Sequence, residues 1–197
     1  MKIWNWHIQI YLNMIYMFLS EKQLKKIGFA SYGKNILISD KCSIYNPANI
    51  ILGNNVRIDD FCILSAGENG IEIGNHVHIG CYSLLVGKEK ITMKDYSGLS
   101  SRVSIYSSSD DFTGEYLSNP CVPDKYRNVI SKPVTLNEQV TIGTNCTILP
   151  GVTIEKNSCV YAHSLVLKSI RENVCVTGVP AKEIKERKKC IYNLLIN

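Results

Sequence analysis

A short acidic and hydroxyl-rich stretch in the middle of the chain carries the side chains best suited to polar chemistry. Asp110, Asp111 and Glu115 follow directly on the serine run 107–109. Carboxylates and hydroxyls can bind the hydroxyl groups of a ligand or hold a positively charged amine. The stretch therefore predicts a site for a sugar-like ligand, with a tolerated insertion that only projects into solvent as the alternative.

The histidines offer a second kind of chemistry, which is proton transfer. His76 and His78 lie in the segment GNHVHIG, and His163 lies in VYAHSLV, with no histidine between His78 and His163. Imidazole titrates near neutral pH, so either of the first two could act as a general base if it reaches a cleft. A surface or interface role is the alternative. For His163 a catalytic role is not expected.

Positive charge gathers near the C-terminal end of the chain. The formal net charge is +5, and Lys168, Lys182 and Lys185 contribute to this basic end. Such a cluster could attract an anion, while a solvated surface is the alternative. No basic stripe interleaved with aromatic residues accompanies it, so no nucleic-acid partner is expected.

The eight cysteines are spread singly along the chain, without a CxxC pair. This spacing argues against a disulfide scaffold and against a metal site. We interpret them as reduced, mostly buried thiols of a cytoplasmic protein.

The elements that must position these groups are predicted by a repeat with a period of six residues. Downstream, one aliphatic residue recurs at every sixth position, in the series Leu136, Ile142, Ile148, Ile154, Val160 and Val166. Upstream, the same period continues with short insertions through Ile38, Ile44, Leu52, Ile58, Leu64, Ile73, Ile79, Leu85, Met93, Leu99 and Ile105. A period of six fits neither an α-helix nor a long strand.

It fits a solenoid in which three hexads close one triangular coil and the aliphatic residues fill its interior. Glycine, asparagine and aspartate are expected at the tight corners. The repeat stops after Ile105 and resumes near Val134, which leaves 106–133 as a long inserted loop. Loops of this length in compact proteins are usually functional.

With these features the chain resembles the hexapeptide-repeat sugar acyltransferases, which include the galactoside and maltose O-acetyltransferases. The resemblance spans about 33–187 and is carried by the repeat, the inserted loop, VTIGTNCTILPGVTI and the closing VTGVPAKEIKER. The loop sequence YSSSDDFTGEY is most similar to the branch that acylates nucleotide-linked amino sugars, such as the dTDP-4-amino-4,6-dideoxyglucose N-acyltransferases. The resemblance implies an all-β fold, a left-handed parallel β-helix.

It also implies a homotrimer with active sites between subunits and an acyl-CoA cosubstrate, by default acetyl-CoA. By position, Thr144 and Ala162 would contact the pantetheine arm. Lys168, Lys182 and Lys185 would meet the phosphates, as point charges do. Leu167 departs from the threonine that the family often has there.

A further departure concerns the acceptor. The O-acetyltransferases of the family use a loop histidine as general base, and that position falls at Asp110 here. A carboxylate is poorly matched to deprotonating a hydroxyl, whereas an amine needs less assistance. We therefore expect N-acylation of a nucleotide-linked deoxyamino sugar for surface polysaccharide (O-antigen) synthesis. Asp110 or Asp111 would orient the amine, with Glu115 assisting.

The alternative is O-acetylation of a sugar hydroxyl, with His78 or His76 as base. A β-helix carbonic anhydrase or a non-catalytic β-helix is the third interpretation. The histidine spacing lacks the ligand pattern of the former, and no metal is expected.

Three regions follow along the 197 residues. Residues 1–32 are expected to form an N-terminal helical segment, 33–180 the β-helix, and 181–197 a short C-terminal helical tail. The apolar stretch from Ile3 to Leu19 is interrupted by polar residues and falls short of a membrane span. An amphipathic helix packed on the protein is expected there, with membrane-surface association as the minor alternative.

Overall fold

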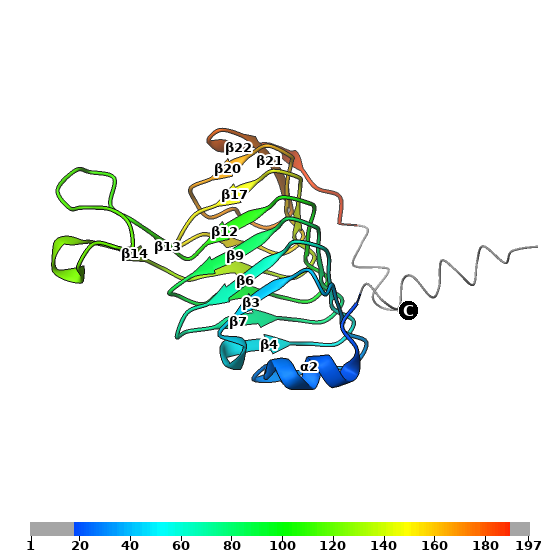
Figure 1. The fold of residues 1–197 in the computed structure, drawn as a ribbon. Coiled ribbons are helices and arrows are strands. Elements are labelled where there is room, and N and C mark those ends of the chain that lie inside the picture. The colour runs from blue at the N-terminus through cyan, green and yellow to red at the C-terminus, as the bar shows by residue number, and fades with distance from the viewer. Residues whose placement is uncertain (1–17, 190–197) are drawn as a thin grey trace, which may run out of the picture.

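The computed structural model describes residues 18–189, which wind into a left-handed parallel β-helix with three flat faces (Figure 1). Face 1 consists of β1 (Ser31–Tyr32), β4 (Ile50–Leu52), β7 (Ile71–Ile73), β10 (Ile91–Met93), β15 (Val134–Leu136) and β18 (Thr153–Ile154). Face 2 consists of β2 (Leu37–Ile38), β5 (Arg57–Ile58), β8 (His78–Ile79), β11 (Gly98–Leu99), β16 (Thr141–Ile142), β19 (Cys159–Val160), β21 (Val174–Gly178) and β22 (Ala181–Glu186). Face 3 consists of β3 (Ser43–Tyr45), β6 (Ile63–Ala66), β9 (Leu84–Gly87), β12 (Ser104–Tyr106), β17 (Thr147–Ile148) and β20 (Leu165–Val166).

Columns of aliphatic side chains fill the interior, as the repeat predicts. On face 1, Leu52 pairs with Ile73, Ile73 with Met93, and Met93 with Leu136. The six downstream hexad positions are at most 2% exposed. Upstream, only Ile44, in the first coil, is half-buried. The predicted core residues are therefore confirmed, and each coil is stabilised by burial against its neighbours.

The corners differ in detail from the sequence expectation. Asparagines do occupy left-handed positions there, but so do Phe61, Tyr82, Arg102 and His76. The glycines that follow the aliphatic residues serve another purpose. A Cβ on Gly53 would lie 2.6 Å from the carbonyl carbon of the glycine one coil further on. Such glycines let successive coils approach closely.

A helix covers the N-terminal end of the solenoid (Figure 1). Helix α2 (Glu21–Ile27) begins with a capping box, in which Ser20 and Gln23 satisfy each other's backbone N–H groups, and ends at Gly28 in the left-handed conformation. Its residue Leu24 is buried in the core. The helix expected over 3–19 falls largely on 1–17, which lie outside the described residues.

The C-terminal segment is a strand where a helix was expected. Strand β22 runs antiparallel to β21 with Thr177 opposite Lys182. The helical prediction is therefore wrong for residues 181–186. The open edge of face 2 offers unpaired backbone groups, and pairing with them outweighs the helix propensity of a Lys/Glu-rich segment. Residues 190–197 lie outside the described part.

The loop interrupts the solenoid between β12 and β15. The two ends of the loop, β13 (Ser108–Ser109) and β14 (Ile130–Ser131), pair with each other antiparallel. The rest of the loop projects away from the solenoid (Figure 1). Two short 3-10 turns complete the described structure, Pro47–Asn49 and Asp124–Tyr126. Within residues 18–189 no helix has the length and apolar character needed to cross a membrane.

Candidate active site

The root of the loop is anchored to the coil before it. The hydroxyl of Ser107 is buried and donates to the carbonyl oxygen of Glu89 at 2.6 Å, and the amide of Lys132 donates to the carbonyl of Ser107 at 3.0 Å. Gly87 lies beneath, where a Cβ would meet the Ser107 hydroxyl. The acidic residues therefore start from a fixed base.

Asp111 is buried and organises the loop. Its Oδ1 accepts hydrogen bonds from the Thr113 amide at 2.7 Å and the Thr113 hydroxyl at 2.6 Å, and its Oδ2 accepts from Asn128 at 3.4 Å. The bonds from Thr113 are the main cause that holds the pKa of the Asp111 carboxyl below its usual value. Both oxygens are thus committed to the loop itself.

Asp110 and Glu115 are less constrained. Oδ2 of Asp110 accepts one hydrogen bond, from the Asn119 amide at 3.2 Å, and the side chain is half-buried. Glu115 is exposed further along the loop. The three acidic residues predicted from sequence therefore share one loop but have different partners, and Asp110 keeps the greater capacity for a ligand.

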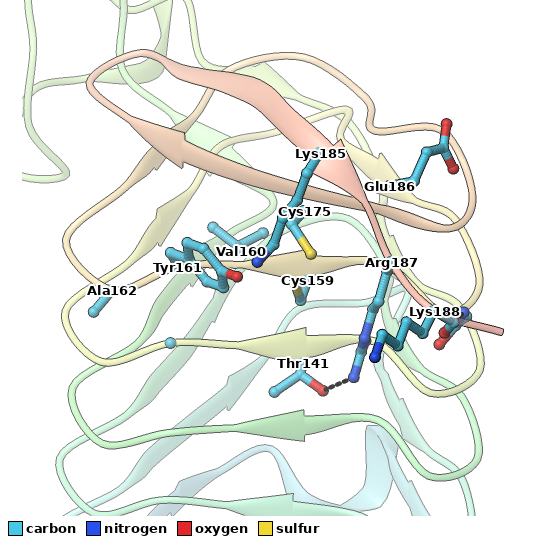
Figure 2. Close-up of a pocket in the computed structure, with 12 residues that line it drawn as sticks. Thr141, Cys159, Val160, Tyr161, Ala162, Cys175, Lys185, Glu186, Arg187 and Lys188 are labelled. Carbon is cyan, nitrogen blue, oxygen red and sulfur yellow. Dashed lines mark hydrogen bonds between the residues drawn. The ribbon is translucent and has the colours of Figure 1, made fainter. Parts of the chain in front are cut away.

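A cleft of about 720 Å³ opens on face 2 near the C-terminal end of the solenoid, and β22 forms one wall (Figure 2). Ala162 and Lys185, two of the predicted cofactor contacts, both line it. The full lining consists of Thr141, Gly143, Asn157, Cys159, Val160, Tyr161, Ala162, Cys175, Lys185, Glu186, Arg187 and Lys188. Thr144 lies beside this lining, and its carbonyl accepts from the His163 amide at 2.8 Å.

Cations stand on one side of the cleft. The Nζ of Lys185 lies 5.6 Å from the centre of the Tyr161 ring, and a hydrogen bond with the Tyr161 side chain raises the pKa of Lys185 (Figure 2). Arg187 donates to the carbonyl oxygens of Gln139 at 3.1 Å and Ser158 at 3.0 Å. The cleft can therefore accept a ligand that carries negative charge.

Arg187 and Lys188 were not singled out among the cofactor contacts from the sequence. The sequence does show basic residues near the C-terminal end. The segment was expected to be a helix, however, and a helix groups its residues on different faces than the strand β22 does. Lys168 lines a second, smaller cavity of about 250 Å³ with Arg171 and Glu183. Lys182 is exposed on β22 outside both linings. The predicted cofactor residues are therefore only partly brought together.

His78 is held by partners that the sequence did not indicate. Its Nε2 lies 2.7 Å from Oδ2 of Asp59, and Nε of Arg57 donates to Oδ1 of the same carboxylate at 2.7 Å. Burial raises the pKa of Asp59, but the hydrogen bonds from His78 and Arg57 outweigh it, and the pKa is lowered overall. The imidazole is half exposed and oriented, as a proton acceptor requires.

His76 has a different environment. Its ring stacks on Tyr96 with centroids 4.9 Å apart, and Nε2 lies 3.3 Å from Nδ2 of Asn55. These contacts link successive corners. In the described part of the chain, no three His, Cys, Asp or Glu side chains form a group that could hold a metal ion.

No family model matches the chain. Among known proteins, it is 47% identical over 177 residues to the dTDP-4-amino-4,6-dideoxy-D-glucose acyltransferase of Escherichia coli, a match that covers 90% of this chain and 92% of that protein. It is 30% identical over 135 residues to the galactoside O-acetyltransferase of E. coli K12, over 68% of this chain and 63% of that protein.

Solved structures show the same relationship. AntD, an N-acyltransferase from Bacillus cereus, superposes with a TM-score of 0.87 at 45% identity, over 91% of this chain and 95% of AntD, in a structure with dTDP and 3-hydroxybutyryl-CoA. A serine-to-alanine variant of AntD, in complex with dTDP-4-amino-4,6-dideoxyglucose and coenzyme A, superposes with a TM-score of 0.88 at 46% identity. The match extends over nearly the whole solenoid.

Proposed function

The chain belongs to the hexapeptide-repeat sugar acyltransferases, in the branch of the dTDP-4-amino-4,6-dideoxyglucose acyltransferases, and we propose that it acylates the amino group of a nucleotide-linked deoxyamino sugar. The observation that carries this proposal is the 47% identity, over 90% of this chain, to a dTDP-4-amino-4,6-dideoxy-D-glucose acyltransferase. Acetyl is the default acyl group, and the 3-hydroxybutyryl-CoA bound to AntD makes a longer chain the alternative.

The cleft on face 2 is proposed as the acyl-CoA site. Ala162 is small and allows the pantetheine arm to approach the backbone, while Lys185 offers a point charge for a phosphate. Arg187 and Lys188 add positive charge to the same cleft. Thr144 borders it, whereas Lys168 and Lys182 lie outside it and could contact only parts of the cosubstrate that extend beyond.

The loop is proposed to supply the acceptor site. Asp110 holds and orients the amine, and Glu115 assists, while Asp111 keeps the loop in shape through Thr113. The neutral amine attacks the thioester carbonyl, a C–N bond forms, and the C–S bond breaks. The sulfur leaves with coenzyme A, and the surplus proton passes to a base or to the departing thiolate.

A homotrimer in the cytoplasm is the proposed assembly. The loop stands clear of its own solenoid (Figure 1), which supports the proposal that its acidic residues act at the cleft of another copy. A role in surface polysaccharide synthesis follows from the same proposal, because a putative lipopolysaccharide O-acetyltransferase of E. coli K12 is 31% identical over 161 residues.

The experiment is to incubate the purified protein with acetyl-CoA and 3-hydroxybutyryl-CoA against a panel of nucleotide amino sugars and neutral glycosides, following thiol release. Turnover with amino sugars alone is expected. Turnover confined to neutral glycosides would contradict the proposal and support the second candidate.

That second candidate is O-acetylation of a sugar hydroxyl, and one observation favours it. The His78 imidazole, held by Asp59 at 2.7 Å, has the arrangement of an oriented general base. A hydroxyl acceptor requires such a base before it can attack, whereas an amine requires it only to take up the surplus proton.

A further inference from the structure

Gly98 stands out among the 13 glycines of the chain. Each of the others either adopts a positive φ or has a neighbouring atom less than 3.0 Å from the position of an added Cβ. Gly98 meets neither condition, since its nearest such neighbour is the carbonyl oxygen of His78 at 3.7 Å, an ordinary van der Waals distance. The protein fold therefore has room for a side chain at this position.

Glycine weakens a strand because it loses more conformational freedom on folding and packs no side chain. A glycine inside a strand often marks a bulge, a tight bend, or a place where a ligand or another backbone comes close. Strand β11 pairs with β8 and β16 without a register shift, which leaves the close approach of another molecule as the explanation. Gly98 is such a glycine, and it is half-buried on the outer surface of β11.

The neighbours of Gly98 on face 2 give the site its chemistry. Gly98 pairs with His78 on β8 and with Thr141 on β16. His78 carries the hydrogen bond to Asp59, and Thr141 lines the cleft. Neighbouring strands lie about 4.8 Å apart, so the imidazole strand and the cleft strand are separated by about 10 Å. Gly98 lies between His78 and Thr141 and leaves the backbone of β11 uncovered by a side chain.

We propose that Gly98 forms the floor of the acceptor subsite, on which the sugar ring lies between the His78 imidazole and the thioester delivered by the cleft. The inference rests on the proposed function. Asp59 is a positioning residue, because it accepts from Nε2–H of His78 and so leaves the lone pair of Nδ1 free to take the acceptor proton. The acceptor nitrogen forms its bond to the carbonyl carbon, the C–S bond breaks, and the proton passes from Nδ1 to the departing thiolate.

The direct test adds bulk at the floor through Gly98→Ala and Gly98→Val. We expect Gly98→Val to raise the acceptor KM at least tenfold or abolish turnover, with Gly98→Ala intermediate. The Kd for coenzyme A measured by calorimetry and the elution volume should stay close to the wild type, and the unfolding temperature should not fall. Thr92→Ile is the matched control, because Thr92 is half-buried on β10 in the same coil but belongs to face 1. Its kinetics should be unchanged.

Normal acceptor kinetics in Gly98→Val would overturn the subsite while leaving the proposed function intact. A changed elution volume would overturn it as well, because the glycine would then be explained by contact between copies. If the wild-type protein acylated no acceptor of the panel, both the proposed function and the subsite at Gly98 would be contradicted.

A second measurement tests the positioning role. Asp59→Asn and His78→Ala should each lower kcat at least tenfold with little change in the acyl-CoA KM, and the double variant should be no worse than His78→Ala. Asp59→Glu should recover part of the lost kcat. Losses that add in the double variant would show that Asp59 does not act through His78.

Discussion

At the scale of single residues, the neighbouring carboxylates of Asp110 and Asp111 have different hydrogen-bond partners and therefore different expected roles. Asp110 has one weakly held oxygen, whereas Asp111 is enclosed by Thr113 and Asn128. We expect Asp110→Asn to lower turnover of an amino-sugar acceptor by about 10²-fold without loss of stability. Steady-state kinetics and thermal unfolding check this, with Ser118→Ala as a loop control. Unchanged turnover would remove Asp110 from the acceptor site.

The hydrogen bonds of Asp111 also predict a pH dependence. Its folded pKa is lowered, so its stabilising contribution is complete above the unfolded value of about 3.9 and is lost as the pH falls through the lower folded value. Limited proteolysis of the loop should therefore accelerate below about pH 4 in the wild type. Asp111→Asn should already be cleaved rapidly at neutral pH, with little further change in acid. A wild-type rate that stays flat into acid would refute this account.

Lys185 and Lys182 lie on the same strand, β22, so the second can serve as a control for the first. Lys185 lines the cleft beside Tyr161, and Lys182 does not. Loss of one charge-assisted contact is expected to raise the acyl-CoA KM about tenfold in Lys185→Ala. Lys182→Ala should change it much less, and added salt should reduce the difference between the two. Equal effects would mean that the phosphates lie outside the cleft.

At the scale of the elements, two glycines on the solenoid should respond oppositely to the same substitution. Gly53→Ala forces a Cβ to within 2.6 Å of the next coil's backbone, and we expect a loss of about 2 kcal/mol in unfolding free energy. Gly98→Ala is expected to gain about 0.4–1 kcal/mol, because it restricts the unfolded chain. Denaturant unfolding of both variants measures the contrast. A loss at Gly98 as large as at Gly53 would mean that backbone packing explains both glycines.

The regular part of these elements could be predicted from the sequence because a six-residue period fits a triangular solenoid, while its left hand came from the family resemblance. Ile142, Ile148 and Val160 lie where the repeat places them. The strand β22 could not be predicted from the sequence, because it pairs with a sheet edge that exists only after the last coil has formed. The Asp59–His78 contact was missed for the same reason, because the two residues are 19 apart and meet only across coils.

The types of residue in the candidate site could be predicted from the sequence, but their arrangement in space could be predicted only in part. The acidic loop and the basic chain end were visible, and Ala162 and Lys185 do share a cleft. The separation of Lys168 into another cavity follows from its place after β20, on a different face. The spacing of six between Ala162 and Lys168 already places them on successive faces, but it does not show that β22 makes a cleft on the first of these faces.

At the scale of the whole molecule, the projecting loop predicts that two defective chains can repair each other. Asp110→Asn chains retain an intact cleft, and Lys185→Ala chains retain an intact loop. If each site combines the loop of one copy with the cleft of another, an equal mixture refolded together should recover about a quarter of the wild-type activity at low acyl-CoA. Refolding each variant alone is the control. No recovery would place both residues of a site on the same chain.

The two ends of the solenoid set a limit on its growth. A stack of identical coils has no natural length, because each terminal coil presents unpaired strand edges to which another molecule could add. Here α2 covers one end with Leu24 in the core, and β22 reverses direction along the edge of β21 at the other. Because β22 runs antiparallel and is the last strand of face 2, a further parallel coil would have to pair there with a strand of the opposite direction. Within residues 18–189, the parallel stacking of coils on face 2 therefore ends at a strand whose direction does not continue it.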